Sequence, residues 1–178
     1  GMVYKMKVYR LPAGSPQSRG KALVNVLPLE KDEWITTVMP LPEEEESWAN
    51  LDAVFATVSG NIRRNKLSDF TNVKANGKIA MKLDEGDRLI SVSVCSDDQD
   101  IMLSTKLGKS LRCQVEAVRV FAGRSSTGVR GIRLAEGDSV IGMSILRHSD
   151  DTPEQRDDYL RAQAAAKRLQ YGEYSQAE

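Results

Sequence analysis

Hydrophobic and polar positions follow one pattern twice along the middle of this chain. The block VFATVSGNIRR at 54–64 returns as MLSTKLGKSLR at 102–112, and GKIAMKLDEGDRLI at 77–90 returns as GVRGIRLAEGDSVI at 128–141. A period of about 50 residues, built from short strands and Gly turns, is typical of propeller-type arrays, in which each repeat buries its apolar face against a neighbour. The pattern predicts an all-β fold of antiparallel, propeller-like blades that form part of a ring.

The same strand and turn signals occur in both copies. Residues 53–57 and 101–105 are apolar runs that each end at a Gly turn, as buried strands do, whereas residues 89–94 alternate with a period of two, as a half-exposed strand does. The Glu-Gly-Asp steps at 85–87 and 136–138 predict hairpin turns, because Gly adopts positive φ and Asp bonds to the local backbone.

The pattern divides the chain into four portions. Residues 1–47 are expected to be the later part of a blade followed by an acidic linker, residues 48–96 a complete blade (the first repeat), residues 97–149 a second one (the second repeat), and residues 150–178 a helical tail or insertion. Two complete blades and part of a third are fewer than the three or more repeats that an independent array needs. We therefore expect a partial ring, whose unpaired edge strands also allow two copies to associate.

The last portion predicts a C-terminal α-helix over about residues 153–170. Thr152 is a suitable N-cap, Pro153 suits the first helical position, and Gln155 completes a capping box. The apolar stripe of this helix is narrow and rich in Ala, so the helix either docks weakly on a blade or stands out as a linker.

Composition excludes several classes of function. The 178 residues are 40% hydrophobic, enough for one core, and include no membrane-length apolar run and no signal-peptide pattern, which predicts a cytoplasmic, nucleoid-associated protein. His148 is the only histidine, and Cys95 and Cys113 lack metal-ligand spacing. With no nucleotide-binding or metalloprotease motif either, we predict no catalytic site, no metal site and no cofactor in this chain.

The net charge of zero hides a segregation of charge along the chain. Bases outnumber acids between residues 61 and 133, whereas acids gather at 43–46 and after 149. Cations recur at matched positions, Arg64 with Arg112 and Lys82 with Arg133. A ring would present such cations as a spaced series along its rim, which suits the phosphates of duplex DNA. The alternative is that they are ordinary solvated bases that keep edge strands apart.

We predict that the cations of the repeats contact DNA phosphates. Contacts of this kind do not read base sequence, and a curved basic rim favours wrapping of the duplex. The predicted DNA-binding residues are Arg63, Arg64, Lys66, Lys74, Lys78, Lys82, Lys106, Lys109, Arg112, Arg124, Arg130 and Arg133.

Three motifs carry a resemblance to a known family. MKVYRLP at 6–12, GKALVNVLPLE at 20–30 and STGVRGIRLAEGD at 126–138 resemble segments of the C-terminal domain of bacterial DNA gyrase A, and the resemblance spans about residues 4–147. It implies a β-pinwheel, a propeller-like ring of about six blades, whose basic perimeter wraps DNA. It also implies that this wrapping supports ATP-dependent negative supercoiling by the gyrase holoenzyme.

The same resemblance implies the partners of the domain. These are duplex DNA, the rest of the gyrase A polypeptide and the gyrase B polypeptide in an A2B2 holoenzyme, a type IIA topoisomerase whose catalytic tyrosine, Mg²⁺ site and ATP site belong to other domains. The glycine-rich basic box of the family is absent, and residues 16–21 are only a faint echo of it. The predicted helix from Pro153 also stands where a further blade is expected.

Two other interpretations remain open on sequence. The C-terminal domain of the paralogous topoisomerase IV polypeptide has similar blades, although residues 128–138 look more like gyrase. A propeller-like scaffold that binds a protein or peptide would need an exposed aromatic or apolar patch, for which Trp34 and Trp48 are the only candidates in the sequence. Packing in the core or the linker is the simpler role for both tryptophans.

Overall fold

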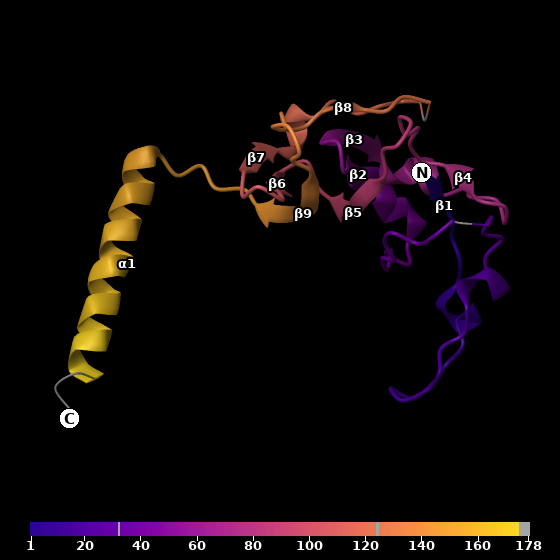
Figure 1. Cartoon of the computed structure of the whole chain (residues 1–178), viewed down its shortest axis with the longest axis horizontal. Coiled ribbons are helices and arrows are strands. Elements are labelled where there is room, and N and C mark those ends of the chain that lie inside the picture. Colours follow the sequence, from indigo (N-terminus) through magenta and orange to yellow (C-terminus); the bar gives the residue numbers. More distant parts are fainter. Residues whose placement is uncertain (32, 124, 175–178) are drawn as a thin grey trace. The chain divides into compact units, whose positions relative to one another are not determined.

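The computed structural model describes residues 1–31, 33–123 and 125–174, with the side chains of the last helix described as far as residue 170. Arg124, one of the predicted DNA contacts, lies outside the described residues. The chain forms two compact bodies, Gly1–Arg147 and a second that begins at His148 (Figure 1). The first body contains the β-sheets, and the second contains the long helix.

Each repeat folds into three antiparallel strands. The first repeat contributes β2 (Asp52–Thr57), β3 (Asn61–Lys66) and β5 (Leu89–Cys95), and the second contributes β6 (Gln99–Thr105), β7 (Ser110–Gln114) and β9 (Val140–Arg147). The register is the same in both, since Asp52 faces Lys66 and Asp100 faces Gln114. The predicted class of antiparallel, propeller-like blades followed by a helix is confirmed.

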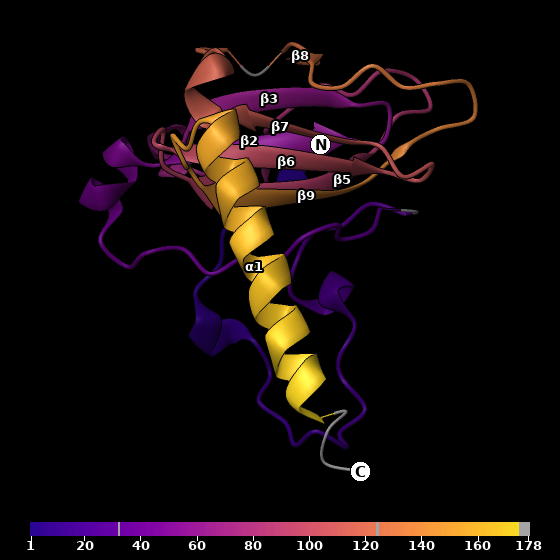
Figure 2. The ribbon, with the colours of Figure 1, turned by 90° about the vertical axis from the view of Figure 1, so that its left-hand side faces the viewer.

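A short strand passes from each repeat to the segment before it. β8 (Val129–Arg130) belongs to the second repeat but pairs with the start of β3, where Asn61 faces Arg130, so that one sheet has the order β5-β2-β3-β8. In the same way β4 (Lys78–Ile79) pairs with β1 (Met2–Val3). Figure 2 shows β8 along the outer side of β3. The sequence patterns did not predict this exchange.

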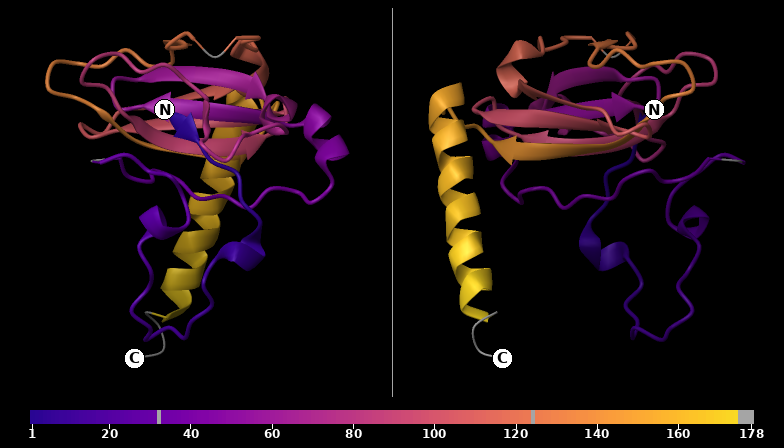
Figure 3. Two further views of the ribbon diagram at one scale, coloured as in Figure 1. Left: turned by 90° about the vertical axis from the view of Figure 1, so that its right-hand side faces the viewer. Right: turned by 60° about the vertical axis from the view of Figure 1, so that its left-hand side comes forward.

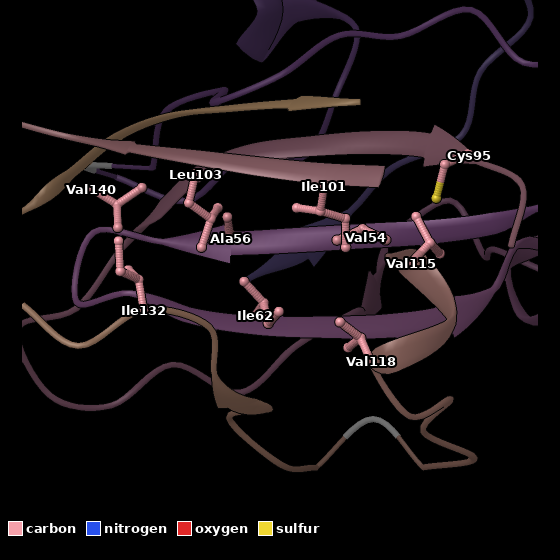
Figure 4. Close-up of a cluster of buried hydrophobic side chains, with 10 residues drawn as sticks. All are labelled: Val54, Ala56, Ile62, Cys95, Ile101, Leu103, Val115, Val118, Ile132 and Val140. Carbon is pink, nitrogen blue, oxygen red and sulfur yellow. The ribbon is translucent and has the colours of Figure 1, made fainter. Parts of the chain in front are cut away.

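The two repeats share one hydrophobic core. Val54 and Ile62 of the first repeat are buried together with Ile101, Leu103 and Val140 of the second (Figure 4). Burial of a side chain of this size contributes about 1.5–3 kcal/mol. Each sheet therefore depends on its neighbour for the burial of its apolar face, as the repeat pattern predicted.

A second cluster lies within the first repeat and its flanking segments. The rings of Phe55 and Phe70 lie 6.0 Å apart between their centroids, and Trp48 packs with them. Trp48 is 2% exposed and its indole N–H donates to the carbonyl of Pro42 (2.9 Å). This cluster includes Trp48 of η3 (Glu45–Asn50), the 3-10 turn that begins within the acidic linker.

The segment before this linker forms no blade of its own in the part of the chain that the structure describes. Beyond β1 it contains only two 3-10 turns, η1 (Val8–Arg10) and η2 (Leu23–Asn25), on an otherwise irregular course (Figure 3). Trp34 is 67% exposed. The expectation that both tryptophans are packed is therefore wrong for Trp34, which lies in a stretch, residues 33–40, that forms neither helix nor strand.

Helix α1 (Pro153–Tyr174) begins where the sequence predicts and is longer than predicted. The Thr152 amide donates to Oε1 of Gln155 (2.8 Å), and the Gln155 amide donates to Oγ1 of Thr152 (3.2 Å). This reciprocal pair of bonds is the expected capping box. The side chains from 153 to 170 are all exposed.

Asp87 holds two turns of the first repeat together. Its carboxylate accepts a hydrogen bond from the Ser59 amide (3.0 Å), in the turn between β2 and β3, and another from the amide of Arg88 (2.9 Å). Burial raises the pKa of Asp87, but hydrogen bonds from Ser59, Thr57 and Arg88 outweigh it and lower the pKa below its ordinary value. Asp138 repeats the arrangement, accepting from the amide of Leu107 (3.0 Å).

We expect the Asp87 bonds to make stability depend on pH. Because the pKa is lower in the folded state, the stabilisation is fully present above the unfolded value of about 4 and is lost as pH falls through the folded value. Asp87→Asn should therefore lower the free energy of unfolding by about 1–2 kcal/mol at pH 7 and flatten its dependence on pH below 4. Urea unfolding across this range tests the prediction, with the exposed Asp84→Asn as control. Equal pH dependence in wild type and Asp87→Asn would contradict it.

Gly128 permits the close approach of β8 to β3. Its φ is 88°, and a Cβ added there would lie 2.3 Å from the carbonyl oxygen of Ile62. Gly137 also has positive φ, 74°, but a Cβ there would meet nothing within 4 Å.

Gly128→Ala should consequently destabilise the chain more than Gly137→Ala. The left-handed backbone costs about 1–2 kcal/mol in both variants, and the clash with Ile62 adds about 1–3 kcal/mol in the first. The difference between their urea midpoints measures this effect. If the two variants unfold at the same midpoint, the contact between β8 and β3 is looser than the structure shows.

Candidate nucleic-acid interface

Two segments carry the chain from the edge of a repeat back to the part of the chain that precedes that repeat. We call residues 67–83 the first crossover segment and residues 115–134 the second crossover segment. They begin with the 3-10 turns η4 (Leu67–Phe70) and η5 (Val115–Ala117) and contain β4 and β8, respectively. In the second, Val120 forms a parallel bridge with Arg64, and the Phe121 amide donates to the Arg64 carbonyl (2.8 Å) before the chain reaches β8. This segment covers the outer edge of β3.

Both crossover segments are basic. The first contains three lysines and one acid, and the second contains four arginines and one acid. The cations that lie exposed on them are Lys74, Lys82, Arg119, Arg130 and Arg133. These segments therefore concentrate accessible positive charge along the outer edge of the sheets.

Arg64 does not belong to this exposed set. Its guanidinium is buried against Asp52, with Nη2 2.7 Å from Oδ2, and Nη1 donates to the carbonyls of Val115 (3.0 Å) and Val118 (3.2 Å) in the next repeat. All of these partners are protein groups. We correct the prediction that Arg64 contacts a phosphate, because its side chain is used inside the protein to join the two repeats.

Arg63 is likewise buried. Nε donates to Oδ1 of Asn65 (2.8 Å), Nη1 donates to the carbonyl of Ser126 (2.5 Å), and the guanidinium lies 5.0 Å from the ring centroid of Phe121. Burial lowers the pKa of Arg63. Its predicted role as a phosphate contact is corrected for the same reason as that of Arg64.

Three more of the predicted cations have partners within the protein but remain at least partly exposed. Lys66 pairs with Asp52 (3.0 Å), Lys78 donates to the carbonyl of Asp69 (2.6 Å), and Arg112 pairs with Asp100 (2.5 Å). The others that the structure describes are exposed, namely Lys74, Lys82, Lys106, Lys109, Arg130 and Arg133.

Arg119 is an exposed cation that the sequence prediction omitted. It lies 4.2 Å from the ring centroid of Phe121 and belongs to the second crossover segment. It has no basic counterpart in the first repeat, where Thr71 stands, so a search for matched cations missed it. The charge of the crossover segment as a whole would have been the better signal.

Removal of Arg64 should cost far more stability than removal of Arg112. Arg64→Gln deprives the buried Asp52 of its closest partner, which should lower the free energy of unfolding by about 3–5 kcal/mol. Arg112→Gln should cost clearly less, because the Arg112 side chain is 47% exposed, so that solvent already screens the pair and water can replace the guanidinium beside the Asp100 carboxylate. Urea unfolding of both variants makes the comparison. Similar losses would show that burial of Arg64 contributes little.

The paired sheets and the basic outer edge define a class of protein, a propeller-like domain with a positively charged perimeter. A model of the DNA gyrase C-terminal domain, a beta-propeller, matches residues 1–42, 52–96 and 99–147. The chain belongs to this family. The resemblance that the sequence motifs suggested is therefore confirmed.

Sequence identity to the gyrase A polypeptides of two bacteria supports the same family. The DNA gyrase A polypeptide of Granulibacter bethesdensis is 54% identical over 178 residues, which are 99% of this chain and 19% of the relative. The DNA gyrase A polypeptide of Escherichia coli is 42% identical over 147 residues, which are 83% of this chain and 16% of the relative. The chain spans less than a fifth of the length of these relatives.

Solved structures show the fold at lower identity. The C-terminal domain of DNA topoisomerase IV has a TM-score of 0.69 at 23% identity and covers 80% of this chain and 43% of that one. The DNA gyrase A C-terminal domain has a TM-score of 0.65 at 23% identity and covers 80% and 44%. The fold alone thus fits both proteins that the sequence left open, whereas the relatives with 42–54% identity are gyrase A polypeptides.

Within the described residues, no three His, Cys, Asp or Glu side chains form a group that could hold a metal ion. In the same part of the chain, no helix is long and apolar enough to cross a membrane.

Proposed function

We propose that this chain binds duplex DNA without regard to base sequence and guides it along the two crossover segments. The observation that carries the proposal is the gathering of Lys74, Lys82, Arg119, Arg130 and Arg133 on those segments, all exposed. Cations of this kind neutralise phosphates and release condensed counterions. A rim that contacts the backbone repeatedly favours a curved duplex, as in other proteins that wrap DNA.

In a longer protein of the same kind, we propose that such wrapping supports ATP-dependent negative supercoiling. The family and the names of the relatives support this step. The partners would be the rest of the gyrase A polypeptide and the gyrase B polypeptide in an A2B2 holoenzyme in the cytoplasm, with ATP, Mg²⁺ and the catalytic tyrosine held by other domains.

Exposed cations of the crossover segments should account for the affinity for DNA. We expect Lys82→Gln, Arg130→Gln and Arg133→Gln together to weaken binding of a labelled mixed-sequence duplex in fluorescence anisotropy. Each lost phosphate contact should reduce the slope of log K against log salt by about 1, and thus by up to about 3 in total, between about 50 and 200 mM salt.

The matched control removes the same charge from helix α1. Arg156→Gln, Arg161→Gln and Lys167→Gln change exposed side chains outside both crossover segments. This control should bind with wild-type affinity and slope. Equal weakening in the two triple variants, or no binding by the wild type at low salt, would contradict the proposal and would favour a scaffold that contacts protein.

A further inference from the structure

The aromatic ring of Phe121 contacts two arginines of different burial. The guanidinium carbon of Arg119 lies 4.2 Å from the ring centroid, and that of Arg63 lies 5.0 Å from it. Arg63 is buried, Phe121 is 7% exposed, and Arg119 is exposed. One ring therefore contacts a cation inside the protein and a cation at its surface.

The main chain fixes Phe121 in place. Its amide donates to the carbonyl of Arg64 (2.8 Å), and its carbonyl accepts a hydrogen bond from the side-chain amide of Asn65 (2.8 Å). Arg64 and Asn65 are successive buried residues of β3. Because its residue is bonded on both sides to a buried strand, the ring is a fixed support for the side chain that packs on it.

The contact with the ring leaves the hydrogen-bond donors of Arg119 free. A cation–π contact uses none of the N–H groups of a guanidinium. Within the described residues, the Arg119 side chain makes no hydrogen bond and no ion pair. The guanidiniums of Arg64 and Arg112 differ, since they face the carboxylates of Asp52 and Asp100. Arg119 therefore keeps the planar set of donors that binds a phosphate through two parallel hydrogen bonds.

Arg63 adds positive charge beneath this surface. Its guanidinium donates to Asn65 and Ser126 but forms no ion pair in the part of the chain that the structure describes, and its Nη2 is buried without a hydrogen-bond partner. Arginine stays protonated at neutral pH, and the protein interior screens charge less than water does. The two cations on the ring consequently repel each other, and an anion bound at Arg119 relieves this repulsion.

The first crossover segment lacks this arrangement. Counted from the starts of η4 and η5, Thr71 stands at the position of Arg119 and Val73 at the position of Phe121. Neither the cation nor the ring is therefore present in the first crossover segment, and the stacked arginine is particular to the second.

We propose that Phe121 is a positioning residue that holds Arg119 as a fixed phosphate-binding site on the second crossover segment. The ligand is a phosphate group of the duplex backbone, so this inference rests on the proposed binding of DNA. A side chain that is already ordered loses less conformational entropy on binding than a flexible lysine such as Lys74 or Lys82. The duplex is thus held more firmly at the second crossover segment than at the first.

Variants of the full chain test the site by fluorescence anisotropy with a labelled mixed-sequence duplex. Arg119→Gln should weaken binding and reduce the slope of log K against log salt by about 1. Phe121→Leu keeps the charge but removes the ring, so it should weaken binding about twofold to fivefold and leave the slope unchanged. In the Arg119→Gln background, Phe121→Leu should have no further effect. Phe55→Leu, which removes an equally buried ring from β2, should bind as wild type does.

NMR detects the stacked arginine without DNA. The Nε–Hε signal of Arg119, assigned by its loss in Arg119→Gln, should be shifted by the ring current of Phe121 in the wild type. In Phe121→Leu the signal should move to the position of a solvated arginine, while the remaining signals report whether this variant is folded.

Three results would overturn this inference and leave the proposed function standing. These are unchanged affinity in Arg119→Gln when the wild type binds duplex, equal weakening by Phe121→Leu with and without Arg119, or an Arg119 signal without a ring-current shift. Absence of duplex binding by the wild type at low salt would overturn the proposed function and the phosphate site together.

Discussion

The ion pair between Arg64 and Asp52 is the contact on which the joining of the two repeats depends. A buried pair alone stabilises little, since both charges lose their hydration. Here the remaining N–H groups of the guanidinium are also used, because they bind the carbonyls of Val115 and Val118 in the following repeat. One side chain therefore neutralises Asp52 and fixes the segment that delivers β8 to β3.

Local features of the structure followed well from sequence, because local residues encode them. The strand at 89–94, the Gly turns and the capping box from Thr152 each depend on neighbours a few positions away, and the structure contains all of them. Two details differ from the prediction. The residues from 89 to 94 are all half-buried without alternation, and the turns at 85–87 and 136–138 are not hairpins, because the strands that they join pair with other strands. The exchange of β4 and β8 between repeats depends on residues far apart in the chain. A two-residue strand is too short to show a hydrophobic period, so only the structure could reveal the exchange.

Of the predicted DNA-binding cations, only some are exposed in the structure. The reason is not distance along the chain, as it is for β4 and β8, but the ambiguity of a repeated cation. A cation repeated at matched positions has the same sequence signature whether it faces phosphate or binds a carbonyl inside the protein. The distinguishing signal was the aspartate that recurs with it, since Asp52 precedes Arg64 as Asp100 precedes Arg112. Matched Asp–Arg pairs indicate a structural contact. Exposed cations such as Arg119 and Arg130 have no such recurring aspartate, and they belong to the set on which the proposed binding of DNA rests.

The crossover segments thus have two roles in this account, because they join the repeats on their inner side and present cations on their outer side. Chemical acetylation of the lysines with and without a mixed-sequence duplex tests this most directly, read for each lysine by mass spectrometry. DNA should protect Lys74 and Lys82 on the first crossover segment and leave Lys167 on helix α1 fully reactive. Unchanged reactivity of Lys74 and Lys82 in the presence of bound duplex, or equal protection of Lys167, would contradict the claim that the crossover segments form the DNA-binding surface.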